Sequence, residues 1–167
     1  MQPAFCVLKP QPEVWYTLIG NNEFTGDIMR VELYSCLPLE AVGIRERVFV
    51  EEQGFRNEFD CIDSKAVHFV LFDDGEGAIG TCRVYKDEQD NSYVLGRLAV
   101  TKENRGKNAG ALMVKKAEEY VQGLGGKEIK LHAQCRVSEF YKKLGFSEFG
   151  GLDDDEGCPH IWMIKRL

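Results

Sequence analysis

The chain has 167 residues and a net charge of −6, a length that fits one domain with a sizeable core. Hydrophobic residues make up 44% of it and charged residues 29%, which is ordinary for a soluble globular protein. The acidic balance argues against a nucleic-acid partner, because such proteins need a basic face. It suits a cationic amine substrate, or serves solubility alone.

No apolar run approaches the ~20 residues of a membrane span, and the N-terminus lacks the basic region of a secretory signal. We therefore expect a cytoplasmic protein without a membrane partner. The six cysteines show neither C-x-x-C nor zinc-finger spacing, so no metal is expected. Reduced, buried thiols are expected instead.

Residues 1–28 form an N-terminal extension to a domain at 29–167. The extension carries several large apolar side chains, including Trp15, Tyr16 and Ile19, which a disordered tail would rarely hold. We expect it to pack on the domain or on a partner chain, and the second arrangement would suit a homodimer.

Alternating apolar residues predict a strand over 28–35, and Pro38 then introduces a helix over 39–50. An acidic loop follows at 51–65. The elements expected after it are strands over 67–72, 78–85 and 93–100, a helix over 109–124, a strand over 128–133, a short helix before Gly145, and strands over 146–149 and 161–165 around an acidic loop at 153–156. This order predicts an α+β domain with a mixed sheet.

The helix over 109–124 is strongly amphipathic. The residues expected to face the core are Met113, Ala117, Tyr120, Val121 and Leu124. Those expected to face solvent are Lys115, Lys116, Glu118, Glu119 and Gln122. The helix should therefore pack one side on the sheet.

The most informative stretch is the polar loop at 101–108, between an apolar strand and this helix. Small residues such as Gly106 let backbone N–H groups approach a ligand, and the helix start adds its positive dipole end. This combination favours an anion site, typically for a phosphate. The alternative is an ordinary basic turn before a surface helix. The sequence holds neither the P-loop motif nor G-x-G-x-x-G after an early strand, which argues against nucleotide folds of those kinds.

A second motif runs from Phe140 to Phe146 and predicts a short helix stopped by Gly145, followed by a strand. Together with the loop sequence Arg105-Gly106-Lys107-Asn108-Ala109-Gly110, it resembles the GCN5-related N-acetyltransferase (GNAT) family. That family's pyrophosphate motif is Q/R-x-x-G-x-G/A, and its later motif is F-Y-x-K-x-G-F. Asn108 stands where the family usually has glycine, and asparagine tolerates a left-handed backbone.

Four further elements resemble the ElaA-like branch of this family. They are F-x-x-E-Q at 49–53, E-x-D-x-x-D at 58–63, L-x-A-Q at 131–134 and G-x-P-H-x-x-M at 157–163. The resemblance implies a GNAT-like fold over 29–167, with a mixed, mostly antiparallel sheet flanked by helices on both faces. It also implies direct transfer of an acetyl group from the co-substrate acetyl-CoA to a primary amine of a small molecule or protein, in a ternary complex.

The resemblance places the coenzyme on two segments. The residues expected to bind it are Leu98, Ala99 and Val100 at the pantetheine arm, Arg105, Gly106, Lys107, Asn108, Ala109, Gly110 and Ala111 at the pyrophosphate, and Phe140, Tyr141 and Lys143 in the later motif. Tyr141 is expected to stabilise the leaving thiolate, because a phenol with a pKa near 10 can hydrogen-bond to it. A purely structural ring is the alternative.

The acceptor side is less defined. The candidates for the general base are Glu52, Asp60, Asp63, His68 and His160. Glu52 ranks first because it lies in the family-matching Glu-Gln pair, although a surface charge is an equal alternative. The candidates for substrate binding are Glu52, Asp63, His68, Gln134 and His160. The loops at 51–65 and 150–159 are expected to shape the amine pocket.

Two other functions stay open from the sequence. One is a non-catalytic acyl-CoA-binding regulatory module, which Asn108 in the pyrophosphate loop would favour. The other is a structural role in an oligomer, which the apolar extension would favour. The retained Tyr141 and Glu52 favour an enzyme.

Overall fold

The structure, a computed structural model, describes residues 14–17, 28–74 and 77–167. It divides into two compact units. Unit 1 runs as far as Arg83 and includes Arg97–Met113, and unit 2 comprises Val84–Gly96 and Val114–Leu167.

The strands form a mixed, mostly antiparallel sheet with the order β1-β2-β3-β4-β5-β6-β8-β7. Their bounds are β1 Val14–Thr17, β2 Ile28–Tyr34, β3 Val67–Asp73, β4 Gly77–Lys86, β5 Tyr93–Val100, β6 Glu128–Gln134, β7 Ser147–Asp155 and β8 Cys158–Arg166. The α-helices of the described residues are α1 Leu39–Arg45, α2 Ala109–Gly123 and α3 Ser138–Lys143. The predicted α+β fold class is therefore confirmed.

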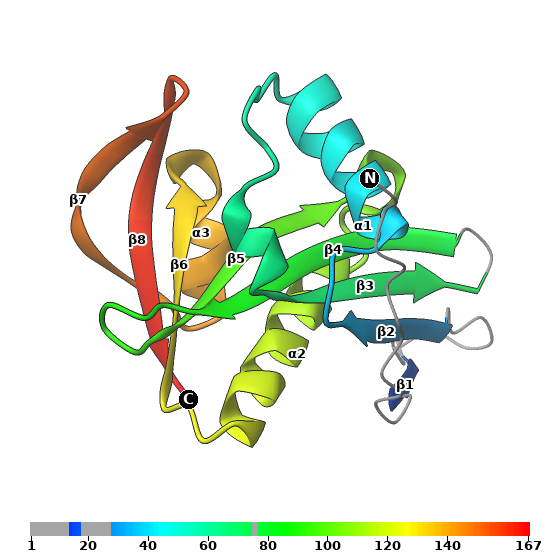
Figure 1. Cartoon of the computed structure of the whole chain (residues 1–167). Helices are drawn as coiled ribbons and strands as arrows, with labels where there is room; N and C mark the ends of the chain where they lie inside the picture. Colours follow the sequence, from blue (N-terminus) through cyan, green and yellow to red (C-terminus); the bar gives the residue numbers. More distant parts are fainter. Residues whose placement is uncertain (1–13, 18–27, 75–76) are drawn as a thin grey trace. The chain divides into compact units, whose positions relative to one another are not determined.

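In unit 1, β1 pairs antiparallel with β2, and β2 pairs antiparallel with β3 (Figure 1). The pairing of Val14 with Val31 joins part of the N-terminal extension to the sheet of its own chain. Residues 1–13 and 18–27 of the extension lie outside the described residues. In β3, the run Phe69, Val70 and Leu71 is buried without alternation, as expected of a strand covered on both faces.

The helix after Pro38 changes character part-way. α1 ends at Arg45, and a π-helical segment, Glu46–Glu52, continues the chain. Ile44 and Val48 are buried on both sides of this change and pack with Ala99 of β5. The predicted helix over 39–50 is therefore correct in place, but its second half is π-helical. The sequence did not distinguish the two forms, because the apolar spacing fits both.

The segment predicted as an acidic loop at 51–65 is partly ordered by its own acids. A 3-10 helix, Cys61–Ser64, begins at Asp60, whose carboxylate Oδ1 accepts from the Ile62 backbone N–H at 2.9 Å. The Asp63 carboxylate accepts from the Asp60 N–H at 3.3 Å, which completes a capping box. Glu58 and Asp63 are buried, so the segment is not simply a solvated loop.

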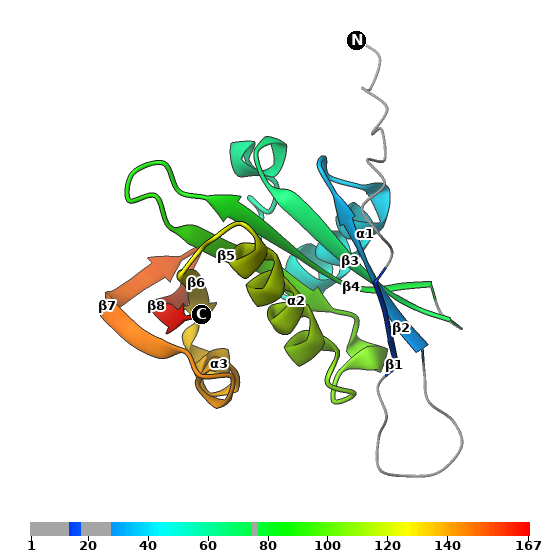
Figure 2. The same cartoon turned by 90° about the horizontal axis from the view of Figure 1, so that it is seen from below.

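In unit 2, β5 and β6 are parallel from the pair Tyr93–Ile129 to the pair Leu95–Leu131. β6 and β7 both pair antiparallel with β8, so β8 lies between them (Figure 2). Ile129, Leu131 and Ala133 alternate with more exposed residues along β6. This alternation is typical of a strand with one face on a core.

The predicted acidic loop at 153–156 is wrong, because Asp153–Asp155 lie in β7 and pair with β8. The turn between the strands is formed by Glu156 (φ 52°) and Gly157 (φ 82°). Two consecutive residues with positive φ are typical of a tight hairpin turn. Asp154 Oδ1 accepts from the Gly157 N–H at 2.8 Å and supports this turn.

Two residues of the predicted α2 pattern differ from expectation. Leu124, assigned to the core, lies just beyond the helix end and is exposed. Lys116, assigned to solvent, is buried, and its ammonium pairs with Glu119. A long lysine stem can cover apolar surface while its charged end reaches a partner. Met113, Ala117 and Val121 are buried as predicted.

The expectation of reduced, buried thiols holds only in part. Cys82 is a buried free thiol, but the free thiol of Cys61 is exposed, and Cys36 is disulfide-bonded. Spacing alone did not indicate this bond, because pairing depends on distance in the fold.

Candidate active site

The loop between β5 and α2 has the backbone shape that an anion site needs. Gly106 and Asn108 adopt left-handed conformations, with φ of 81° and 61°. The Asn108 carbonyl accepts from the Leu112 N–H at 3.0 Å, which begins α2. Asn108 therefore keeps the conformation that glycine would adopt there, as expected from its tolerance of this region.

The loop is also braced from within. The side chain of the buried Asn104 donates to Thr101 Oγ1 at 3.1 Å and accepts from Lys107 Nζ at 3.0 Å. The first N–H groups of α2 have no carbonyl partner within the helix, as at every helix start. Together with Lys107, they offer a positive environment to a phosphate.

Arg105 connects this loop to the π-helical segment. Its Nε donates to the Val100 carbonyl at 3.0 Å, and its Nη1 and Nη2 donate to the two carboxylate oxygens of Glu52, each at 2.7 Å. The hydrogen bond with Glu52 raises the pKa of the Arg105 guanidinium. Arg105, which is expected to bind the coenzyme, therefore contacts Glu52, the first-ranked candidate for the general base.

The end of β5 is fixed by its neighbours in unit 1. The Thr101 N–H donates to the Ile79 carbonyl at 2.9 Å. A Cβ at Gly80 would lie 3.3 Å from the Ala99 carbonyl oxygen, so the small residue allows a close approach there. The side chain of Ala99 packs on Ile44 and Val48. The backbone of Leu98, Ala99 and Val100 is thus well supported.

A buried charge cluster lies beside this strand. Arg45 of α1 contacts Glu58 Oε1 at 2.6 Å and Asp63 Oδ1 at 2.7 Å. Arg83 of β4 contacts Asp60 Oδ1 and Asp63 Oδ1, both at 2.7 Å. The arginines were not predicted as part of a site. Their signal in the sequence is a charge inside an apolar run, which seldom stays unpaired.

The carboxylates of this cluster differ in their pKa values. Burial alone would raise the pKa of Asp63, but hydrogen bonds from Arg45 and Arg83 lower it to about 2. Burial is the largest influence on Glu58 and raises its pKa, although nearby arginines oppose the shift. Asp63 is thus fixed as an anion, and Glu58 holds a proton more readily than an ordinary glutamate.

Asp63 and His68, two of the predicted substrate-binding residues, are buried. Asp63 is held by the two arginines, and His68 is only 1% exposed. His68 Nε2 lies 2.9 Å from the Asp63 carbonyl, and burial lowers the pKa of its imidazole. Asp60 is likewise engaged by Arg83. The side chains of these three residues are therefore all engaged by partners within unit 1.

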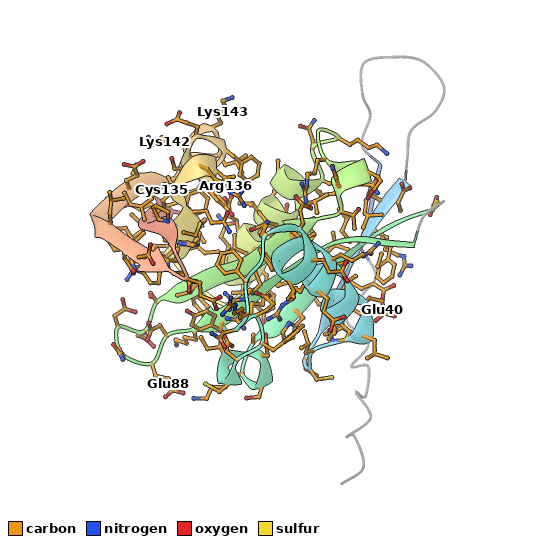
Figure 3. The ribbon with its side chains drawn as sticks, turned by 90° about the horizontal axis from the view of Figure 1, so that it is seen from above. Glu40, Glu88, Cys135, Arg136, Lys142 and Lys143 are labelled. Atoms are coloured by element: carbon orange, nitrogen blue, oxygen red, sulfur yellow. The ribbon has the colours of Figure 1, made fainter. Side chains whose placement is uncertain are left out.

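In unit 2, Tyr141 lies in α3 between two other aromatic rings. Its ring is 5.0 Å from that of Phe140 and 5.9 Å from that of Phe146, centroid to centroid, and the residue is 9% exposed. Its carbonyl accepts from the Phe146 N–H at 3.1 Å, across Gly145 with φ of 90°. Lys143 is exposed, and Figure 3 shows it with Arg136 and Lys142 around α3.

Gln134 and His160 are opposite each other in the β6–β8 register. Gln134 Oε1 accepts from Arg136 Nε at 2.7 Å. His160 is buried, and its Nδ1 lies 2.8 Å from the Cys158 carbonyl. Its ring is 4.9 Å from that of His132, whose pKa burial lowers. The two predicted substrate residues are therefore brought together.

A hollow in unit 1 opens beside the π-helical segment. Its lining residues are Glu46, Val50, Glu51, Arg56, Asn57, Glu58 and Phe59. Val50 is 38% exposed and Phe59 43%. The hollow overlaps the loop at 51–65 that we expected to shape the amine pocket, and it combines carboxylates with apolar surface.

The sequence of residues 39–167 matches the acetyltransferase (GNAT) domain. The chain belongs to the GNAT family. Both GNAT motifs predicted from the sequence, at 105–110 and 140–146, fall within the matched region. The family assignment makes the chain a GNAT acyl-CoA N-acyltransferase by class, with an acyl-CoA as co-substrate.

Several relatives resemble this GNAT chain along most of its length. It is 30% identical to the protein ElaA of Escherichia coli over 141 residues, covering 81% of this chain and 88% of the relative. It is 29% identical to the uncharacterized protein YyaT of Bacillus subtilis over 133 residues, covering 77% and 88%. The crystal structure of Escherichia coli ElaA superposes with a TM-score of 0.70 at 25% identity, covering 81% and 99%.

Within the described part of this GNAT chain, no helix is long and apolar enough to cross a membrane. The same residues hold no group of three or more side chains suited to a metal ion.

Proposed function

We propose that the chain is an acetyl-CoA-dependent N-acetyltransferase that acts on a primary amine in a ternary complex. The observation that carries this proposal is the loop at 105–111. It combines the left-handed Gly106 and Asn108 with two basic side chains and the start of α2, which together suit a pyrophosphate.

Asn108 had favoured a non-catalytic alternative. Its φ of 61° lies in the same left-handed region as the φ of 81° at Gly106, so asparagine preserves a backbone shape that glycine would adopt. Because Asn108 was the feature that favoured a regulatory module, we favour the enzyme.

The chemistry requires three contributions from the protein. The amine must lose a proton, the thioester oxygen must be stabilised, and the leaving thiolate must gain a proton. We assign proton acceptance to Glu52 and stabilisation of the oxygen to the backbone N–H groups of Leu98–Val100. We assign proton donation to the Tyr141 hydroxyl.

The transfer then balances without a further reactant. The amine nitrogen forms a bond to the thioester carbonyl carbon, and the carbon–sulfur bond breaks. The proton lost by the amine passes to Glu52, and the CoA thiolate receives the proton of Tyr141. Solvent restores both side chains to their starting states.

The acceptor site that we favour is the hollow beside the π-helical segment. Glu46 and Glu51 provide negative charge, which would attract an ammonium group before its deprotonation. Val50 and Phe59 provide partly exposed apolar surface, which would hold the body of the amine. We therefore propose an amine with an apolar or aromatic body.

Calorimetric titration with acetyl-CoA is the first test, followed by an amine panel scored by release of the CoA thiol. We expect micromolar binding and faster turnover of arylalkyl amines than of polar diamines. Absence of binding up to millimolar acetyl-CoA would overturn the enzyme proposal. Binding with a preference for polar amines would keep the enzyme and reject the hollow as acceptor site.

A further inference from the structure

Arg97 has an unusual backbone for a residue inside a strand. Its φ is 54°, in the left-handed region. The other non-glycine residues with positive φ in the described chain are Asn91, Asn108 and Glu156, and all three lie in turns or loops. Non-glycine residues adopt this region at a cost and remain there only where the surroundings require it.

The side chain of Arg97 contacts two carboxylates. Its Nε lies 3.1 Å from Glu58 Oε1 and donates to the Glu58 carbonyl at 3.2 Å. Its Nη2 lies 3.2 Å from Asp60 Oδ2. The side chain thus holds the 58–60 segment through three contacts.

Each of these carboxylates also contacts a second arginine. Arg45 contacts Glu58 at 2.6 Å, and Arg83 donates to both oxygens of Asp60 at 2.7 and 2.8 Å. Arg45 and Arg83 are buried, so the partners of Arg97 have little freedom to move. A rigid carboxylate pair can therefore hold a strained strand residue in place.

Arg97 lies in β5 directly before the residues that we expect to face the acyl-CoA thioester. Leu98, Ala99 and Val100 follow directly, and the parallel register with β6 ends at Leu95. A left-handed residue between these segments redirects the strand and re-aims the peptide groups that follow. Glycine would adopt the same φ without strain, yet the chain uses arginine here and glycine at position 96.

We propose that Arg97, held by Glu58 and Asp60, is a positioning residue that aims the Leu98–Val100 backbone at the acyl-CoA thioester. This inference rests on the proposed function. It assigns the side chains of Glu58 and Asp60 a task in positioning the acyl donor.

The test compares Arg97→Ala, Arg97→Gly and Arg97→Lys with the unchanged chain. Amide hydrogen exchange at residues 98–100 is recorded without ligand, with CoA and with acetyl-CoA, and calorimetry gives both dissociation constants. In the unchanged chain, acetyl-CoA should slow exchange at these amides at least threefold more than CoA does. Arg47→Ala, an exposed arginine of the π-helical segment, is the matched control.

We expect Arg97→Ala to lose the additional protection by acetyl-CoA while its CoA dissociation constant changes less than twofold. Arg97→Gly should recover part of the protection, because glycine accepts the left-handed backbone. Arg97→Lys should also recover part of the protection, because its positive charge can still attract the carboxylates of Glu58 and Asp60. If Arg97→Ala fails to fold, Asp60→Asn gives the same test with Arg97 in place.

The proposal is overturned if Arg97→Ala keeps the additional protection, or if the unchanged chain binds acetyl-CoA without protecting residues 98–100 more than CoA does. It is also overturned if protection and CoA affinity fall together, since that pattern indicates general loosening of the site. Failure of the unchanged chain to bind acetyl-CoA would instead reject the proposed function.

Discussion

Arg105 and Glu52 form a two-pronged ion pair, with both N–H···O distances at 2.7 Å. The pair joins the loop that we assign to the pyrophosphate to the end of the π-helical segment. Both side chains are partly exposed, so the pair itself contributes little stability. A pyrophosphate entering the loop would compete with Glu52 for the guanidinium and would leave the carboxylate free to accept a proton.

Substitutions on each side of this pair should change coenzyme binding in opposite directions. Arg105→Ala should weaken acetyl-CoA binding by roughly 5- to 30-fold, because it removes about 1–2 kcal/mol of charge-assisted bonding to phosphate. Glu52→Gln should tighten binding about twofold, because the competing anion is gone. Calorimetry at low and moderate salt measures both effects.

The matched control is Arg47→Ala, which removes an exposed arginine outside the loop. Equal affinity of Arg105→Ala and the unchanged chain for acetyl-CoA would contradict the placement of the pyrophosphate.

The role of Glu52 as general base is tested by the pH dependence of turnover. In Glu52→Gln, kcat/KM should fall and its pH profile should lose the acid limb. A retained acid limb would remove Glu52 from that role.

Asn108 offers a test of backbone shape alone. Asn108→Gly should leave acetyl-CoA affinity within about twofold, because glycine accepts φ near 61°. Asn108→Ala should weaken it several-fold, because an alanine there costs about 1–2 kcal/mol. Weaker binding in the glycine variant would mean that the asparagine side chain itself contacts the coenzyme.

The sequence predicted most strands because their buried and exposed residues alternate or form short apolar runs. It did not predict the extent of β7, where every residue is exposed and no alternation exists. The acids at 153–155 then looked like a loop, although an edge strand also tolerates charges and uses them against aggregation.

The candidate site was predictable where local backbone chemistry decides it. Gly106 and Asn108 signalled a turn before a helix, and the structure has one. The cluster around Arg45, Arg83 and Arg97 was not predictable, because its partners come from segments far apart in the chain. A buried arginine becomes informative only when the fold shows which carboxylates reach it.

Tyr141 provides a test of the chemical step. Tyr141→Phe should lower kcat by ~10-fold or more while acetyl-CoA affinity changes less than twofold, because only the proton donor is lost. The ring contacts with Phe140 and Phe146 remain, and the melting temperature of the variant is recorded to separate turnover from stability. Tyr120→Phe in α2 is the control. Unchanged turnover in Tyr141→Phe would leave the residue with a packing role alone.

Asp63 should determine the acid stability of unit 1. Its pKa of about 2 lies below the ordinary 3.8, so its stabilisation is complete above pH 4 and is lost as the pH falls through 2. This amounts to about 2 kcal/mol. Asp63→Asn should cost about 3–5 kcal/mol at pH 7, because Arg45 and Arg83 lose a shared partner.

Urea unfolding from pH 7 to pH 2 measures the Asp63 effect, with the exposed Asp74→Asn as control. The asparagine variant should also lose part of the decline in unfolding free energy between pH 4 and pH 2. An unchanged acid limb would show that other carboxylates determine it.

His68 should make the chain less stable in mild acid. Burial lowers the pKa of its imidazole below the ordinary 6.5, so the unfolded chain binds a proton that the folded chain excludes. The unfolding free energy should therefore fall as the pH drops below about 6.5, by up to ~1.4 kcal/mol per pH unit for one histidine. His132 adds to the decline in the same direction.

The variant His68→Gln tests this effect. Glutamine at position 68 can still donate to the Asp63 carbonyl from its amide nitrogen but cannot titrate. His68→Gln should therefore reduce the slope of unfolding free energy between pH 6.5 and 5 by up to one proton, and an unaltered slope would assign the decline elsewhere.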